Sequence, residues 1–309
     1  MEGRRPVSEE NREMSRIQNI LDKAEREGAT LRTSRVGVPP AGISVPPRID
    51  IPPQPGGDLA GVIAPGAPAV NPGSAAAAVA AAEIESFAVR LNPMLVAGLA
   101  PASPAAEQYR TLRTRLGQAE GTSALRSVLI TSPQKGEGKS ITAANLALTM
   151  AQELQRRVVI VEADLRKPSL QHIFGLPPGP GLAEFLSGAA ELKDVMKSLA
   201  DHHLTVIPGG RAPMNPAELL GSTAMRRLVD HLRTRFDKVI LDTPPVLPLA
   251  DVAVLAPLVD GILMVVRAGF TTRPAIENAL RCFDSSRLIG VVLNESGMED
   301  DYRYEKPKH

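Results

Sequence analysis

Short runs of branched apolar residues recur along the chain from Arg126 onward. These runs occupy residues 127–131, 158–161, 204–207, 239–241, 261–266 and 288–293. Unbroken apolar runs of this length are typical of strands buried on both faces, as a parallel sheet requires. Between them lie helical patterns at 138–155, 223–235 and 272–284, which are long enough for right-handed crossover connections. The pattern therefore predicts an α/β fold with a doubly wound, mainly parallel sheet.

The first 81 residues have a different pattern. Proline, glycine and alanine dominate residues 36–73, and proline neither donates a backbone hydrogen bond nor continues a helix. We therefore expect a flexible arm over 1–81 and the folded domain over 82–296. Within the arm, apolar residues at steps of three and four predict an amphipathic helix at 14–27. A solvated segment and an element that docks on a partner or a membrane surface both fit that pattern.

Composition and charge narrow the classes of function. The chain has 309 residues and a formal net charge of +1, so no bulk basic field favours a nucleic-acid partner. Its single cysteine, Cys282, cannot form an intramolecular disulfide, and its histidines show no metal-site spacing. The charged residues 1–13 do not resemble a secretory signal, and the alanine-rich stretch 75–82 is far shorter than the about 20 residues of a spanning helix. We expect a cytoplasmic protein with no membrane-spanning segment.

The strongest motif is Gly136-Glu-Gly-Lys-Ser140, which lies between a predicted strand and a predicted helix. Glycines let successive backbone N–H groups turn toward a phosphate, and the helix start adds positive potential. Lys139 can reach the β and γ phosphates, and the Ser140 hydroxyl can ligate magnesium. Pro133 stands where the full pattern has its first glycine, yet Gly138-Lys139-Ser140 in this place still predicts a nucleotide site. The predicted nucleotide-binding residues are Lys135, Gly136, Glu137, Gly138, Lys139, Ser140 and Ile141.

Carboxylates follow two other predicted strands. Glu162 and Asp164 come at the end of the second apolar run, and Asp242 comes at the end of the run at 239–241. Because Mg²⁺ takes one or two carboxylates together with phosphate and water, acidic strand ends near Ser140 suit a metal and nucleotide site. Each acid alone is better explained as a cap or a structural ion pair.

Together, the segments 132–140, 162–166, 241–245 and 107–113 resemble the cytoplasmic bacterial tyrosine autokinases of exopolysaccharide and capsule loci. The resemblance covers about residues 82–300. It implies a P-loop NTPase fold related to partition and division-site ATPases, with ATP and Mg²⁺ as cofactors. Lys139, Glu162, Asp164 and Asp242 would be the catalytic residues, with Ser140, Asp164 and Asp242 holding the metal. The acidic motif of the family reads Asp-x-Asp, so Glu162 stands where the carboxylate proposed to activate the tyrosine hydroxyl would lie.

The resemblance also implies partners. Glu107, Arg110 and Arg113 would form an inter-subunit contact of a ring-like homo-oligomer, and their spacing places them on one helical face. Asn294 would present its amide to adenine. The tail at 297–309 carries Tyr302 and Tyr304, the expected phosphate acceptors for a neighbouring subunit.

A membrane polysaccharide co-polymerase or adaptor would recruit the kinase to the inner face of the membrane and link it to exopolysaccharide synthesis or export. Two other functions remain open at this point. One is a partition or division-site ATPase, although that group carries a lysine where this chain has Gln134. The other is a nucleotide-gated scaffold without kinase activity.

Overall fold

The computed structural model describes residues 85–295, apart from 88–89, 120–124, 154–155 and 249. The expected arm at 1–81, its helix at 14–27 and the tail at 297–309 lie outside the described residues. These three expectations therefore stay predictions.

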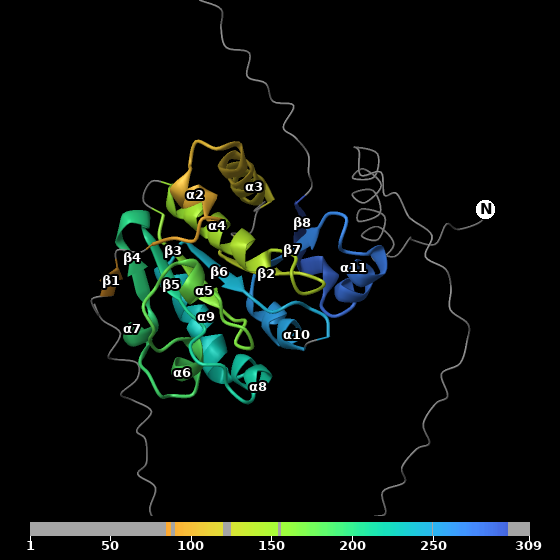
Figure 1. The fold of residues 1–309 in the computed structure, drawn as a ribbon. Coiled ribbons are helices and arrows are strands. Elements are labelled where there is room, and N and C mark those ends of the chain that lie inside the picture. Colours follow the sequence, from red (N-terminus) through yellow and green to blue (C-terminus); the bar gives the residue numbers. More distant parts are fainter. Residues whose placement is uncertain (1–84, 88–89, 120–124, 154–155, 249, 296–309) are drawn as a thin grey trace, which may run out of the picture. The chain divides into compact units, whose positions relative to one another are not determined.

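Within this part of the chain, eight strands form one sheet in the order β1-β4-β5-β3-β6-β2-β7-β8 (Figure 1). The strands are β1 (Glu85–Phe87), β2 (Ser127–Thr131), β3 (Val158–Glu162), β4 (Lys197–Leu199), β5 (Leu204–Ile207), β6 (Lys238–Asp242), β7 (Gly261–Arg267) and β8 (Leu288–Asn294). β4 pairs antiparallel with β5, and the other neighbours pair in parallel. The prediction of a mainly parallel α/β sheet is confirmed. All six predicted strands are present, whereas the short β1 and β4 were not predicted.

Helices cover both faces of the sheet. They are α2 (Val96–Leu99), α3 (Pro104–Ala119), α4 (Lys139–Ala151), α5 (Leu170–Ile173), α6 (Leu182–Leu186), α7 (Leu192–Val195), α8 (Pro216–Leu220), α9 (Thr223–Arg235), α10 (Asp251–Leu255) and α11 (Arg273–Leu280), with 3₁₀ turns at Ala200–His202, Ala256–Leu258 and Ser285–Arg287. The three predicted helices correspond to α4, α9 and α11. None of the described helices combines the length and the apolar character needed to cross a membrane.

The strands divide their apolar side chains between two cores. On β3, Val158 and Ile160 pack with α4, while Val159 and Val161 pack with α9. This alternation follows from the two-residue period of a strand, which sends successive side chains to opposite faces. Figure 1 shows α2, α3 and α4 on one side of the sheet and α6, α8, α9 and α10 on the other. The doubly wound arrangement therefore buries β3 from both sides, as its unbroken apolar run predicts.

The carboxyl ends of the parallel strands meet at one edge of the sheet. Glu162 at the end of β3 lies in register with Asp242 at the end of β6, and Ile130 of β2 is also in register with Asp242. The chain leaves β2 at this edge and re-enters as α4, whose residues 142–151 are all buried. A buried helix fixes the position of its first residue, Lys139. The sheet therefore brings the loop before α4 and the two acidic strand ends together.

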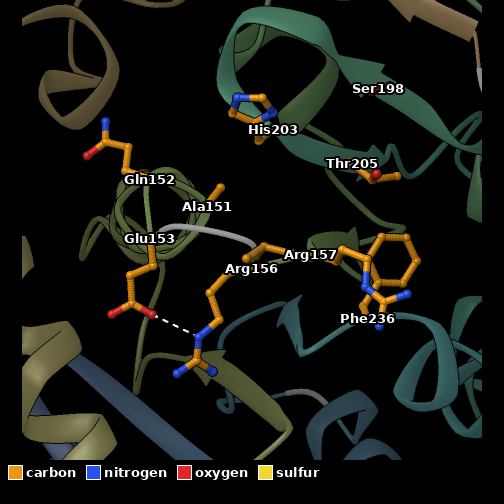
Figure 2. A pocket seen from close by; sticks show the side chains of 10 residues that line it. Ala151, Gln152, Glu153, Arg156, Arg157, Ser198, His203, Thr205 and Phe236 are labelled. Carbon is orange, nitrogen blue, oxygen red and sulfur yellow. Dashed lines mark ion pairs between the residues drawn. The ribbon is translucent and has the colours of Figure 1, made fainter.

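A cavity of about 520 Å³ lies at the opposite end of the sheet. It is lined by the end of α4, the start of β3 and residues of β4 and β5, with Arg156, Arg157 and His203 among its side chains (Figure 2). Because Val158 begins β3 and Glu162 ends it, the length of this strand separates the cavity from the nucleotide loop.

Candidate nucleotide site

The phosphate loop, residues 132–140, joins β2 to α4. Gly136 and Gly138 have φ angles of +88° and +87°, in the left-handed region that favours glycine. A Cβ on Gly138 would also lie 2.2 Å from Nδ2 of Asn294, so the Asn294 side chain would have to move. Gly138 is the N-cap of α4, so Lys139 and Ser140 form the first turn and the helix start faces the loop. This geometry is compatible with the phosphate-binding loop that the motif predicts.

Positive charge gathers at the rim of the phosphate loop. Lys135 is fully exposed, and the neighbouring Lys167 lowers its pKa through a side-chain contact and charge repulsion. Two ammonium groups held this close favour an anion between or beside them. Ile141, the last of the predicted nucleotide-binding residues, lies in the first turn of α4 and is partly buried.

The ammonium of Lys139 lies between the two acidic strand ends. Its Nζ donates to Oδ2 of Asp164 at 2.9 Å and to Oγ of Ser140 at 3.0 Å, and it lies 3.7 Å from Oδ1 of Asp242. Burial alone would lower the pKa of Lys139, but the carboxylates of Asp242 and Asp164 raise it above its ordinary value. Lys139 is therefore held as a cation where the predicted metal ligands converge.

The carboxylate oxygens of Asp242 are free to bind a ligand. Its side chain is fully buried, and among the described residues neither carboxylate oxygen has a hydrogen-bond partner. Burial raises the pKa of Asp242, and Lys139 opposes that rise. A buried polar atom without a partner costs about 1–3 kcal/mol, so such a group is explained by a ligand that supplies the partner. Carboxylate and hydroxyl oxygens from Asp242, Asp164 and Ser140 suit Mg²⁺.

The described residues include no cluster of three or more His, Cys, Asp or Glu side chains that could hold a metal ion by themselves.

Glu162 is buried and makes three hydrogen bonds to the backbone. Its Oε1 accepts from the N–H groups of Ser169 and Leu170, and its Oε2 accepts from the N–H of Gly209 at 2.8 Å. Burial raises its pKa to about 7, and the three N–H donors act against the rise. Glu162 therefore lies beside the site, as predicted, with its oxygens turned toward the backbone.

Residues that follow β7 and end β8 hold the phosphate loop through Glu137. The carboxylate of Glu137 accepts from the N–H of Gln134 at 2.9 Å and from the hydroxyl of Thr271, in the loop after β7. The amide of Asn294 donates to the carbonyl of Glu137 at 3.0 Å. Asn294 thus contacts the phosphate loop directly, and its predicted contact with adenine stays a prediction. Thr271 was missed because nothing local marks a lone threonine 134 positions away from its partner.

The loops that follow β3 and β6 are joined by an ion pair. Arg166 donates to both carboxylate oxygens of Asp251, at 2.7 and 3.2 Å, and Asp251 has no exposed surface. This bidentate geometry is the strong form of an Arg–carboxylate contact. Arg166 belongs to the acidic motif, but its partner Asp251 was not predicted. The only local signal for Asp251 is its place at the start of an apolar stretch.

The comparisons identify the family. The chain is 36% identical to the tyrosine-protein kinase YwqD of Bacillus subtilis over 217 residues, which cover 70% of this chain and 91% of YwqD. The chain belongs to the bacterial tyrosine-protein kinases. No protein-family model matches it. The kinase domain of the Escherichia coli tyrosine kinase ETK superimposes with a TM-score of 0.63 at 31% identity, over 67% of this chain and 82% of that chain.

Other members of this kinase family are much longer than the matched region. The chain is 32% identical to the tyrosine-protein kinase wzc of Salmonella typhi over 212 residues, but it covers only 29% of wzc. It likewise covers 27% of the succinoglycan biosynthesis transport protein ExoP of Rhizobium meliloti, at 35% identity. Membership of the kinase family favours the predicted kinase over the partition ATPase and the scaffold.

The predicted subunit contact has partners within this kinase chain. Arg110 donates to Glu107 at 2.7 Å and to the carbonyl of Pro101 at 2.7 Å. Arg113 donates to the carbonyl of Thr149 at 2.8 Å and pairs with Glu153 at 3.1 Å. Glu107 and Arg110 lie toward solvent, whereas Arg113 ties α3 to the end of α4. The predicted acceptors in the tail lie outside the described residues.

Proposed function

We propose that this chain is an ATP-dependent protein-tyrosine autokinase that phosphorylates Tyr302 and Tyr304 of a neighbouring subunit. The observation that carries the proposal is the position of Lys139, whose ammonium lies 2.9 Å from Asp164 and 3.7 Å from Asp242 at the start of a buried helix. Phosphoryl transfer requires positioning and charge neutralisation more than covalent chemistry by the protein. A fixed cation beside two metal-ligating carboxylates provides both.

Each group has a defined task in this proposal. Backbone N–H groups of the phosphate loop and the start of α4 bind the phosphates of ATP. Lys139 neutralises the charge that develops on the leaving diphosphate. Mg²⁺, held by Ser140, Asp164 and Asp242 together with the phosphates, supplies further charge neutralisation when bound. Thr271 and Asn294 keep the loop in place through Glu137, so its N–H groups stay aligned.

The acceptor tyrosines are assigned to the tail because the chain offers few others. It contains three tyrosines, and the one outside the tail is Tyr109. Burial raises the pKa of Tyr109, and the side chains of Thr142 and Asn145 act against that rise. A buried hydroxyl whose pKa is raised is a poor acceptor. The tail begins after β8, which ends at Asn294 beside the phosphate loop.

We further infer that the kinase forms a homo-oligomer through Glu107, Arg110 and Arg113 and works with a membrane polysaccharide co-polymerase. Relatives with names from polysaccharide export, such as the succinoglycan transport protein ExoP, support such a partner. The partner would bring the kinase to the inner face of the membrane and couple tail phosphorylation to exopolysaccharide synthesis or export.

One mixing experiment tests the kinase assignment and transfer between subunits together. The Lys139→Met chain keeps its tyrosines but loses the catalytic cation, whereas the Tyr302→Phe, Tyr304→Phe chain keeps the site but loses the acceptors. Each alone, incubated with ATP and Mg²⁺, should gain no phosphate by intact-mass analysis. Mixed, they should phosphorylate the Lys139→Met chain at Tyr302 and Tyr304. Undiminished phosphotyrosine in Lys139→Met alone would refute the assignment.

A further inference from the structure

Glu162 joins two loops beneath the nucleotide site. It is the last residue of β3, which pairs in parallel with β5, so the loops that follow these two strands are neighbours. Through Oε1, Glu162 binds the N–H groups of Ser169 and Leu170, which end its own turn, and through Oε2 it binds Gly209 at 2.8 Å. One carboxylate therefore closes the 162–170 turn and attaches it to the 208–210 loop.

The 208–210 loop is shaped to receive this carboxylate. A Cβ on Gly209 would lie 3.0 Å from Cβ of Pro168 and 3.2 Å from Oε2 of Glu162. Gly210 has a φ of +78°, and a Cβ on Gly181 would meet the Gly210 nitrogen at 2.2 Å. Three glycines thus allow backbone to pack against backbone at this junction. The Pro208-Gly-Gly sequence therefore leaves space for the Glu162 carboxylate to pack against the backbone of this loop.

The 162–170 turn carries a metal-ligating residue. Asp164 accepts from the N–H of Lys167 through Oδ1 at 3.1 Å, and its Oδ2 faces Lys139 at 2.9 Å. Because Glu162 ties the start of this turn to its end, the direction of the Asp164 carboxylate depends on that closure. A shorter acid at position 162 has one methylene less and reaches less far.

Both Glu162 oxygens are occupied. A carboxylate offers about four lone-pair positions, and backbone donors take three of them. The fourth position lies on Oε2, but Glu162 has no exposed surface, so a tyrosine hydroxyl arriving from another subunit does not reach that oxygen. A proton acceptor must lie within hydrogen-bond reach of the group that it deprotonates.

We propose that Glu162 is a positioning residue, which holds Asp164 opposite Lys139 by closing the 162–170 turn onto the 208–210 loop, and that it does not accept the tyrosine proton. The inference rests on the proposed kinase function and assigns a different role to the carboxylate at the first acidic position. Substitution of Glu162 would therefore lower activity indirectly, by changing the position of Asp164 and the binding of Mg²⁺.

Two conservative variants separate the two roles because the roles predict different orders of kcat and Mg·ADP affinity among wild type, Gln and Asp. Glu162→Gln keeps the length, but its –NH2 faces the backbone N–H donors of one of the two loops and breaks that link, so a positioning role predicts a loss in both kcat and Mg·ADP affinity. Glu162→Asp cannot reach both loops and should lose more than tenfold in both. For a proton acceptor, the Asp variant stays active while Gln loses about 10²–10⁴-fold in kcat with Mg·ADP affinity unchanged. That second order overturns the proposal.

Further readouts keep the test decisive. In Glu162→Gln the acidic limb of kcat/KM against pH should remain, because another group would produce it, and its disappearance contradicts the proposal. Gly209→Ala, which crowds Glu162 without altering it, should weaken Mg·ADP binding in calorimetry, and unchanged affinity there also contradicts the proposal. Asp194→Asn is the control, since Asp194 accepts from the N–H of Glu191 at 3.1 Å and, among the described residues, has no hydrogen bond to the 162–170 turn or the 208–210 loop.

The experiments distinguish failure of the proposed kinase function from failure of the proposed role of Glu162. If the wild-type chain forms no phosphotyrosine, the proposed function fails, and the order of Mg·ADP affinities still decides the role of Glu162. Circular dichroism of each variant shows whether it folds. If Glu162→Asp does not fold, the Gln variant and Gly209→Ala decide alone.

Discussion

Nζ of Lys139 lies 2.9 Å from Oδ2 of Asp164. In this arrangement one ammonium faces the two carboxylates that are proposed to hold Mg²⁺. When ATP and Mg²⁺ bind, Lys139 would contact the phosphates, and the two carboxylates would contact the Mg²⁺ ion. The contact therefore keeps the site assembled, and the buried Asp242, whose Oδ1 lies 3.7 Å from the same ammonium, shares that single cation with Asp164.

Asp242→Asn should raise stability and remove function. Asp242 is fully buried and shares the Lys139 ammonium with Asp164, so Asn removes the second of two buried carboxylates that face one cation, and we expect a gain of about 1–3 kcal/mol. At roughly 2–4 °C per kcal/mol for a domain of this size, the melting temperature in EDTA should rise by several degrees. Calorimetry should find that the Mg²⁺-dependent part of ADP affinity is lost. A lower melting temperature would contradict this account of Asp242.

Thr271 should control the phosphate loop without touching the nucleotide. Its hydroxyl donates to the buried Glu137 carboxylate, and hydrogen bonds to charged groups contribute about 1.5–3 kcal/mol. Thr271→Val removes the donor and keeps the shape, so Mg·ADP affinity should fall by about tenfold or more. Thr271→Ser keeps the hydroxyl and serves as the control, with affinity near wild type. Equal affinities of the Val and Ser variants would show that the contact is irrelevant.

How far the sequence predicts the molecule depends on the range of each interaction. The strands at 127–131 and 204–207 match β2 and β5 residue for residue, because buried parallel strands need unbroken apolar runs. Gly138, Lys139, Asp164 and Asp242 lie together at strand ends and a helix start, positions that have local signals in the sequence, and their roles stay predictions. The strands β1 and β4 have three residues each, which is too short for a recognisable pattern.

The parts of the site that were missed are contacts between distant segments. Asp251 lies 85 positions from its partner Arg166, and Gly209 lies 47 positions from Glu162. Nothing near either residue distinguishes a site contact from an ordinary cap or turn. The direction of the Glu162 side chain could not be predicted either, because it depends on how the 162–170 turn packs against the 208–210 loop.

Arg110 and Arg113 should differ in their effect on folding. Arg113 ties α3 to the end of α4 through Thr149 and Glu153, so Arg113→Ala should lower the free energy of unfolding by about 1–2 kcal/mol. Arg110 pairs with Glu107 and donates to the carbonyl of Pro101, but both contacts are exposed, and exposed pairs of this kind contribute about 0.3–0.5 kcal/mol. Arg110→Ala should therefore reduce oligomer mass in light scattering while the melting temperature stays nearly constant. An unchanged mass would remove the support for Arg110 as a subunit contact.

The Arg166–Asp251 pair should couple the two loops that carry the metal ligands. Asp251 is fully buried and Arg166 is 38% exposed, so Asp251→Ala leaves a partly hydrated guanidinium without its partner. We expect a loss of about 1–3 kcal/mol in unfolding free energy, less than for a fully buried pair. Mg·ADP affinity should also fall, because Arg166 lies two positions after Asp164. Arg166→Ala is the matched variant, and the double variant completes the cycle.

If the pair acts as a unit, the double variant should be little worse than either single variant, giving an interaction energy of about 1 kcal/mol or more. Chemical denaturation measures this energy for stability, and calorimetry with Mg·ADP measures it for binding. Additive losses in both measurements would mean that the loops after β3 and β6 are held independently. Coupling in stability alone would leave the ion pair as a structural contact with no influence on Asp164.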